Sequence, residues 1–192
     1  MTRCPWAEGH PLLRSYHDQE WGVPQHDDRA LFELLTLEGA QAGLSWLLVL
    51  QRRQAYREAF GGFEPAYVAQ LDPERLLNAP GLIRNRLKLH AAVNNAQRVL
   101  DLQRAHGSLD TFVWSFADQG EPIRHAFQNP DEIPARTRES DALSQALRAR
   151  GFRFVGSTIC YAFMQAAGLV DDHLVSCTAR SSIEASRSSE NR

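Results

Sequence analysis

Two cysteines and two histidines of this chain have the types and spacing of a metal site. Cys4 and His17 lie near the start of the chain, and His173 and Cys177 lie near its end, four residues apart. A spacing of four places both side chains on one face of a helical turn or a tight loop. Two sulfur and two nitrogen ligands suit tetrahedral Zn²⁺ and leave no position for water, so such an ion would be structural. The alternative is that His173 and Cys177 are unrelated surface and core residues.

Glu38 is the one carboxylate in the largely apolar stretch LEGAQAGLSWLLVL, which spans residues 37–50 and also contains Trp46. A buried carboxylate without a partner is costly, so Glu38 must reach water, pair with a cation or serve a ligand. It could simply lie on the wet side of an amphipathic helix, because Glu33 stands among leucines in the same way. Both interpretations stay open at this point.

Helices must position these residues, because helical spacing dominates the chain and no alternating strand of useful length is evident. Aspartate caps, proline at first helical positions and glycine at helix ends mark the boundaries. They predict helices over residues 28–38, 43–60, 65–70, 73–78, 84–105, 108–117, 141–150 and 158–168. The sequence therefore predicts an all-α fold with one domain over residues 1–177. A polar, serine-rich tail, 178–192, follows it, and we expect this tail to be disordered.

Residues 74–97 have the layout of a helix-hairpin-helix. A helix is followed by a tight turn at Pro80-Gly81 and by a second helix that starts near Arg84. Backbone N–H groups at such a turn can bind a DNA phosphate without reading the base sequence. Residues 82–106 contain five basic residues and one acidic residue, although the formal net charge of the chain is −2. This excess fits a phosphate-binding surface, but a solvated helix face would explain it equally well.

Composition narrows the class of protein further. With 43% hydrophobic and 23% charged residues over 192 positions, the chain resembles a soluble globular protein with a sizeable core. It has no apolar run near the roughly 20 residues that span a membrane, and no signal-peptide apolar region near its start. Three cysteines favour free thiols or metal ligands over a disulfide framework. We therefore expect a cytoplasmic protein with no membrane partner.

Six stretches together closely resemble the DNA-3-methyladenine glycosylase I family, a branch of the helix-hairpin-helix DNA glycosylases. They are RCPW (3–6), YHDQEWGVP (16–24), LFELLTLEGAQAGLSW (31–46), GLIRNRLK (81–88), FVWSF (112–116) and SDALSQALRARGFRFVGSTICYAFMQAAGLVDDH (140–173). The resemblance spans residues 3–177. It implies an all-α fold and hydrolysis of the N-glycosidic bond of 3-methyladenine in alkylated double-stranded DNA. It also implies one structural zinc ion, with ligands that fall on Cys4, His17, His173 and Cys177. We expect the protein to act as a monomer.

The resemblance places the family's base pocket on Glu38, Tyr16, Trp46 and Trp6. Methylation at N3 makes adenine a cation, so an aromatic wall gains cation–π energy that neutral adenine does not supply. A carboxylate that accepts from the base edge adds a charge-assisted contact of about 1.5–3 kcal/mol. We expect Glu38 mainly to recognise the base, with stabilisation of charge on the sugar as a second role, and Tyr16 to orient the base.

For DNA contacts we expect Gly81, Arg84 and Arg86 near phosphates, with Leu44 filling the gap that a flipped base leaves. Solvated arginines and a core leucine are the alternatives. The lysine nucleophile of bifunctional relatives would fall near Asn85, whereas Lys88 lies a turn later, so we expect no strand-cutting activity.

Asp101 is the nearest acid, by spacing, to the water-assisting aspartate of other relatives, but it stands in an ordinary surface helix. Rival functions are a non-enzymatic module that recognises alkylated DNA, and a zinc hydrolase with an open metal position.

Overall fold

The computed structural model describes residues 2–180, in which helices form nearly all of the regular structure. The first half contains η1 (Pro5–Ala7), α1 (Pro11–Gln19), α2 (Asp28–Gln41), α3 (Trp46–Ala59), η2 (Gly61–Phe63), α4 (Pro65–Val68) and α5 (Pro73–Leu76). The second half contains α6 (Arg86–His106), α7 (Leu109–Trp114), β1 (Ile123–Arg124), η3 (Pro130–Glu132), α8 (Arg138–Ala149), α9 (Ser157–Ala166) and β2 (Val170–Asp171). The helical character agrees with the all-α expectation.

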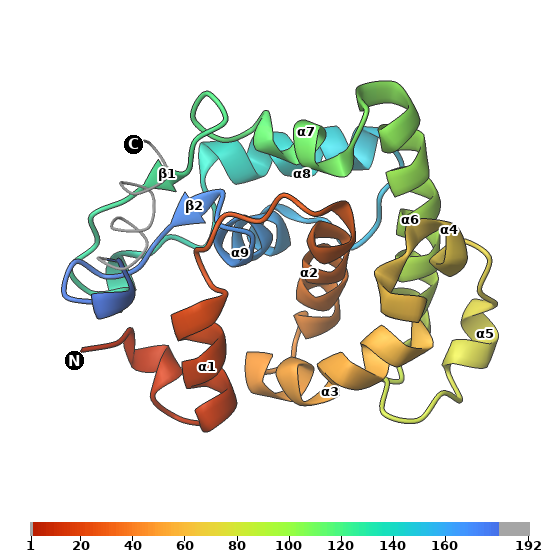
Figure 1. Ribbon diagram of the computed structural model, residues 1–192, viewed down its shortest axis with the longest axis horizontal. Coiled ribbons are helices and arrows are strands. Elements are labelled where there is room, and N and C mark those ends of the chain that lie inside the picture. Colours follow the sequence, from red (N-terminus) through yellow and green to blue (C-terminus); the bar gives the residue numbers. More distant parts are fainter. Residues whose placement is uncertain (1, 181–192) are drawn as a thin grey trace.

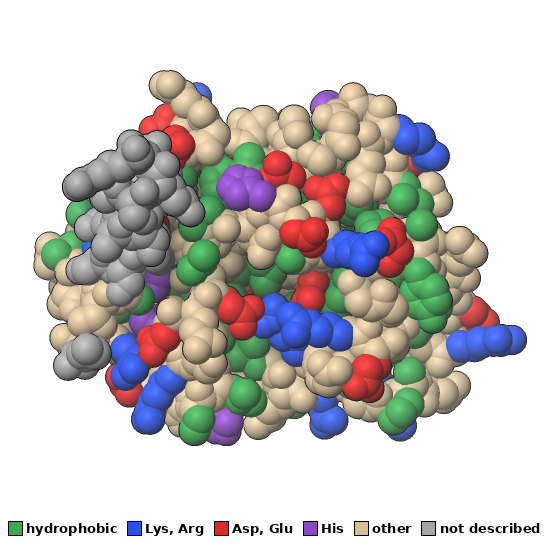
Figure 2. All heavy atoms as spheres, in the orientation of Figure 1, with side chains coloured by type: hydrophobic (Ala, Val, Ile, Leu, Met, Phe, Trp, Pro, Cys, Tyr) green, Lys and Arg blue, Asp and Glu red, His purple; other side chains and the backbone are tan. Residues whose placement is uncertain are grey.

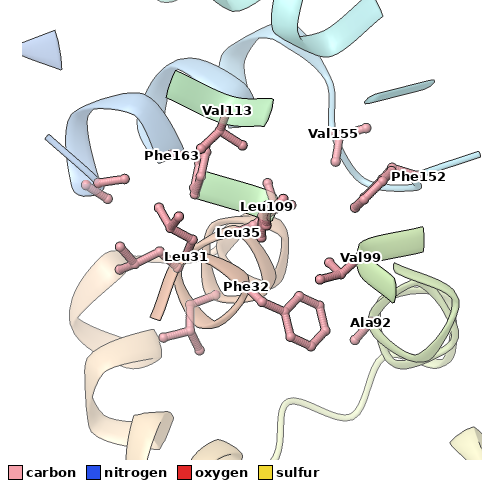
Figure 3. Close-up of a cluster of buried hydrophobic side chains, with 14 of the residues drawn as sticks. Leu31, Phe32, Leu35, Ala92, Val99, Leu109, Val113, Phe152, Val155 and Phe163 are labelled. Atoms are coloured by element: carbon pink, nitrogen blue, oxygen red, sulfur yellow. The ribbon is translucent and has the colours of Figure 1, made fainter. Parts of the chain in front are cut away.

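Helix α2 is the centre of the fold. Every residue from 31 to 40 is buried, and the helix packs against α3, α6, α7 and α9 (Figure 1). A helix that is covered on all sides belongs in a core rather than at a surface. Figure 3 shows its side chains Leu31, Phe32 and Leu35 facing Phe163 of α9 and Val99 of α6, with other apolar groups around them. Residues on α2 therefore have positions fixed by the whole core.

A two-stranded parallel pair forms the only sheet within residues 2–180. Ile123 of β1 pairs with Val170 of β2, and Arg124 pairs with Asp171. Two residues are too few to show an alternating pattern, which is why the sequence predicts no strand here. The pair holds the loop over residues 118–137 against the chain segment that leads to His173.

The two ends of the described chain meet. The amide of Thr178 donates to the carbonyl of Thr2 at 3.0 Å, and Figure 1 shows the first and last described segments on one side of the molecule. Residues 178–180 have helical backbone, so the first three residues of the expected disordered tail are ordered. The rest of that predicted tail, 181–192, lies outside the described residues.

Several predicted helix boundaries are wrong for identifiable reasons. Helix α1 was not expected, because its sequence is mostly polar and its cap is a histidine, His10, which accepts from the amide of Leu12. Helix α2 continues past Gly39 to Gln41. A Cβ on Gly39 would lie 3.4 Å from that of Phe154, so this glycine permits close packing and does not end the helix. Helix α8 starts at Arg138 rather than 141, because Thr137 forms a capping box with Ser140.

The turn between α5 and α6 is longer than predicted, because α5 ends at Leu76 rather than at residue 78 and α6 starts at Arg86 rather than near Arg84. The side chain of Asn85 accepts from the amide of Lys88 and so caps α6. Gly81 lies in this turn with φ +82°, and a Cβ there would come within 2.6 Å of the Cβ of Ala55 on α3. Both the backbone angle and the contact therefore require glycine. None of the helices within residues 2–180 has the length and apolar character needed to cross a membrane.

We predict that Gly81→Ala lowers the free energy of unfolding by about 2–4 kcal/mol, because it combines left-handed backbone strain with a steric clash. Urea denaturation measures this loss. Gly107→Ala is the matched control, because Gly107 has φ +87° and open space around it, so it should lose only the part due to backbone strain. Adding Ala55→Gly to the first variant should recover the steric part. Equal losses in Gly81→Ala and Gly107→Ala would contradict the proposed clash.

Candidate functional site

A cavity of about 260 Å³ opens where the start of the chain meets α2, α3 and α9. This volume is at the small end of the range for ligand pockets and suits one flat heterocycle. We call this cavity the aromatic pocket. It is lined by Trp6, Tyr16, Trp21, Glu38, Gln41, Trp46, Ala162 and Gln165.

Four aromatic rings form the walls of the aromatic pocket. Tyr16 lies 5.2 Å from Trp46, between ring centroids, and Trp6 lies 5.2 Å from Trp21 in an edge-to-face arrangement. Trp6 also contacts Tyr16, at 6.3 Å, and so joins the two pairs. Such rings present electron-rich faces, which favour a flat ligand that carries positive charge.

Glu38 brings a carboxylate without a protein partner into this aromatic pocket. It is 5% exposed, and within residues 2–180 it makes no hydrogen bond or ion pair. Glu33, one turn earlier on α2, is equally buried, but it pairs with Arg53 and with Arg57. The wet-face interpretation of Glu38 is therefore wrong. The contrast with Glu33 indicates that the missing partner of Glu38 is a ligand.

The polar atoms around Glu38 are prepared for a ligand as well. Burial raises the pKa of Glu38 to about 8 and thus favours the neutral acid. A positively charged ligand beside it would lower this pKa and favour the carboxylate. Burial and the nearby Glu38 also raise the pKa of Tyr16, which keeps its hydroxyl protonated as a donor. The hydroxyl of Tyr16 and the indole N–H of Trp46 are buried, and neither has a hydrogen-bond partner within residues 2–180. The aromatic pocket is thus lined by three residues, Tyr16, Trp46 and Glu38, whose polar groups have no hydrogen-bond partner within residues 2–180.

The hollow continues from the aromatic pocket along the surface. A second cavity, of about 280 Å³, shares Glu38, Gln41 and Ala162 with the first and extends to Gly43 and Leu44. Leu44 is 38% exposed at its edge, so it is not a core leucine. The cleft is therefore long enough to receive more than the ligand that reaches Glu38.

Lys88 fixes the loop that borders this second cavity. Its ammonium group donates to the carbonyls of Ala40, at 2.8 Å, and Ala42, at 2.6 Å, at the end of α2. A lysine at this position satisfies carbonyls that have no partner within the helix. The chain has no other lysine. Helix α6, which starts beside the hairpin turn, is thus tied directly to the helix that carries Glu38.

The residues expected to contact DNA phosphates lie at the hairpin turn, but most of the local positive charge is already paired. Arg86 pairs with Glu74, and both Arg98 and Arg104 pair with Asp101. Arg84 is exposed and has no ion pair within residues 2–180. Figure 2 shows basic and acidic side chains interspersed on the visible face rather than gathered by sign. The charge excess of residues 82–106 therefore leaves Arg84 as its clearest free cation.

Three of the four expected metal ligands form one buried group. The Sγ atoms of Cys4 and Cys177 and a ring nitrogen of His17 all lie within 4.8 Å of one another. The Sγ atom of Cys177 is 3.5 Å from Nε2 of His17. Two such ligands on a tetrahedral zinc ion would lie roughly 3.6 Å apart, given the usual zinc–ligand bond lengths. Burial also lowers the pKa of His17, which keeps its imidazole neutral as metal binding requires.

His173, the fourth expected ligand, lies beside this group with a free ring nitrogen. Its ring centroid lies 4.9 Å from that of His17, and its Nε2 is buried without a hydrogen-bond partner. Asp171 contacts Nδ1 of His173 at 2.9 Å, and Asp18 contacts Nδ1 of His17 at 2.8 Å. Carboxylates in these positions leave the two Nε2 atoms free for one ion. The four residues therefore fit a metal ion of the zinc type.

The metal-type cluster and the aromatic pocket share a wall. Trp6 lies 5.3 Å from His17, and Trp21 lies 4.6 Å from His173, between ring centroids, while both indoles line the aromatic pocket. Sequence reasoning did not single out Trp21, Gln41, Ala162 or Gln165. Trp21 could have been found, because it stands in the stretch YHDQEWGVP beside Tyr16 and His17.

A helical fold that holds an unpaired carboxylate among indole and phenol rings is typical of a protein that binds a flat, electron-poor ligand. Comparison with known proteins identifies the family: the chain belongs to the methyladenine glycosylase family, whose model matches residues 6–181.

Individual relatives agree over nearly their whole length. The chain is 49% identical to DNA-3-methyladenine glycosylase 1 of Escherichia coli K12, over 92% of this chain and 96% of that protein. It is 46% identical to DNA-3-methyladenine glycosylase of Haemophilus influenzae, over 94% of this chain and 99% of that protein. A solved variant of 3-methyladenine DNA glycosylase I in complex with 3-methyladenine superposes with a TM-score of 0.89. It is 38% identical, over 93% of this chain and 97% of that one.

We predict that the stability of the free protein falls as the pH rises from about 5 to 8 because of Glu38. The folded protein has a raised pKa of about 8 at Glu38, so over this range it keeps a proton that the unfolded chain releases near 4.5. The contribution of Glu38 to stability is therefore complete below its pKa in the unfolded chain, and it is lost as the pH rises through its pKa in the folded protein. Glu38→Gln should remove this pH-dependent loss. The free energy of unfolding of the variant, relative to that of the wild type, should therefore rise by roughly 2–4 kcal/mol between pH 5 and pH 8.5.

Urea unfolding of both proteins at the two pH values measures this difference. Glu33→Gln is the matched control, because it leaves Arg53 with one partner fewer and should be destabilising at both pH values. A difference between Glu38→Gln and wild type that stays constant with pH would show that Glu38 is not a strained, buried acid.

Proposed function

We propose that this protein is a DNA-3-methyladenine glycosylase, which hydrolyses the N-glycosidic bond of 3-methyladenine in alkylated double-stranded DNA. The observation that carries this proposal is the buried, unpartnered carboxylate of Glu38 inside the aromatic pocket. Membership of the family and the complex of a relative with 3-methyladenine support it. The proposed base-binding residues are Glu38, Tyr16, Trp46 and Trp6.

Recognition would rest on charge. The N3-methylated base in DNA is a cation, so it supplies the positive partner that Glu38 lacks, and it gains cation–π energy from the indole faces of Trp46 and Trp6. The buried hydroxyl of Tyr16 is a free donor and would fix the orientation of the base edge. Neutral adenine offers no charge to offset the cost of ionising Glu38 in this cavity, and it is therefore rejected.

For hydrolysis, the protein mainly has to position the nucleotide. Water attacks C1′ as the C1′–N9 bond breaks, the bonding electrons neutralise the departing base, and the attacking water releases one proton to solvent. Because the base leaves as a neutral molecule, it needs no general acid. The ionised Glu38 would also stabilise positive charge that develops on the sugar. The enzyme must draw the nucleotide out of the stack and hold it at the mouth of the aromatic pocket.

The proposed DNA contacts outside the aromatic pocket come from the turn before α6 and from the loop after α2. Residues 74–97 would act as a helix-hairpin-helix that holds a phosphate at Gly81 and the start of α6, with Arg84 and Arg86 beside it. Leu44, exposed at the edge of the second cavity, would enter the gap left by the flipped base. Lys88 is bound to two carbonyls and is not placed to form a Schiff base, which supports hydrolysis without strand cutting.

One structural zinc ion per chain would be held by Cys4, His17, His173 and Cys177. When bound, it would clip the two ends of the chain together and so fix the wall made by Trp6 and Trp21. A site filled by four protein ligands leaves no place for a metal-bound water, which argues against a zinc hydrolase. We also propose a monomer, with residues 1–177 as one domain. The three free thiols suit a cytoplasmic location.

We predict that the purified protein releases 3-methyladenine from methylated double-stranded DNA and leaves the strand uncut. Chromatography of the released bases and a denaturing gel measure the two results. Glu38→Gln should lower kcat/KM by roughly 10- to 100-fold, because it removes a charge-assisted contact. Binding of alkylated DNA without base release would instead identify a damage-recognition module. A borohydride-trapped adduct would refute the absence of lyase activity.

We predict one zinc ion per chain in the purified wild type. Cys177→Ser should reduce zinc content well below one and lower Tm by several degrees, because both thiolates help to bind the ion. Elemental analysis and thermal unfolding measure these effects. Cys160→Ala is the matched control, because Cys160 is also buried but belongs to the main core, where it donates to the carbonyl of Val155. Full zinc content in Cys177→Ser would contradict the ligand set.

A further inference from the structure

Helix α9 contributes the polar side chain of Gln165 to the aromatic pocket. Gln165 lines the aromatic pocket together with Glu38, which stands on the neighbouring helix α2. Its backbone carbonyl accepts from the amide of Gly22 at 3.0 Å, so its position is tied to the segment that carries Trp21. The side chain is half-buried, and its amide group is the part that can meet a ligand.

A buried network fixes the orientation of this amide. Asp172 is 1% exposed, and its Oδ2 accepts from the amide nitrogen of Gln165, at 2.6 Å, and from the hydroxyl of Tyr161. Its Oδ1 lies 2.7 Å from Nδ1 of His125. Burial raises the pKa of Tyr161, so its hydroxyl keeps the proton that it donates.

A carboxylate oxygen that receives two donors must face the nitrogen of the glutamine amide, not its oxygen. The oxygen is therefore turned away from Asp172, and within residues 2–180 it accepts no hydrogen bond. The amide oxygen of Gln165 is thus the acceptor that this side chain can present to whatever fills the aromatic pocket.

We propose that Gln165 is a specificity-determining residue, whose amide oxygen accepts from the exocyclic amine of the flipped adenine and rejects the carbonyl that guanine has in its place. This proposal rests on the proposed function. Methylation at N3 gives both purines a positive charge, so Glu38 and the rings cannot separate them by charge. The amine of adenine has two hydrogens, enough for both Glu38 and Gln165. Guanine would set an unpaired oxygen against two acceptors, which is a strong basis for rejection.

The test compares the release of 3-methyladenine and 3-methylguanine from the same methylated DNA. Gln165→Met keeps the length of the side chain and removes its acceptor. It should lower the kcat/KM for 3-methyladenine relative to that for 3-methylguanine on the order of 10- to 100-fold, mainly by slowing the release of 3-methyladenine. A structural role alone would slow both reactions together and leave the ratio unchanged.

Tyr161→Phe is the matched control. It removes the other donor to the same oxygen of Asp172, so it should cost stability and leave the ratio within about twofold of wild type. A second measurement needs no variant: wild type acting on an N3-methylated purine without the exocyclic amine should be slower than on 3-methyladenine by at least that factor, because this purine also lacks the donor to Glu38.

Each result decides the matter. An unchanged ratio in Gln165→Met, or a wild type that releases both bases equally well, would overturn the role of Gln165. Failure of wild type to release any base would instead overturn the proposed function, so the two failures are distinguishable.

Discussion

The buried carboxylate of Glu38, left without a partner at the centre of the fold, is the constraint on which the rest of the structure depends. A charge in that position has to be offset by something outside the protein, and the surroundings are arranged so that a ligand can do it. Glu33, on the same helix, has no need of a ligand, because Arg53 and Arg57 of α3 neutralise its charge. The proposed selectivity for a cationic base rests on this single difference.

Keeping Glu38 in place requires contributions from parts of the chain that are distant in sequence. The core holds α2 on all sides, and Lys88 ties the end of that helix to α6 and the hairpin turn. Three of the four wall rings come from the first 21 residues, which a bound metal would fasten to His173 and Cys177. The site is thus assembled at the meeting point of the two chain ends, and the loss of either attachment would open it.

Much of this could be predicted from residue types and spacing. The ligand chemistry of the cysteines and histidines points to a four-residue cluster; the structure groups Cys4, His17 and Cys177, with the ring of His173 beside that of His17. Most helices follow from caps and glycines, but α1 does not, because its few apolar residues face partners that only the folded chain brings near. The network of Asp172 with Gln165, Tyr161 and His125 was equally hidden, since it joins side chains whose types have many surface uses. Contacts that tertiary packing creates leave no period in a sequence.

The most direct test of the central claim is the pKa of Glu38 itself, measured by carbon NMR of its labelled carboxyl group with and without 3,9-dimethyladenine, a base that keeps its positive charge. We expect a pKa near 8 in the free protein, and a value below about 6 when the cation is bound, because the cation stabilises the carboxylate. A pKa close to the ordinary 4.5 in the free protein, or no change on binding, would contradict recognition of the base through the unpaired charge of Glu38.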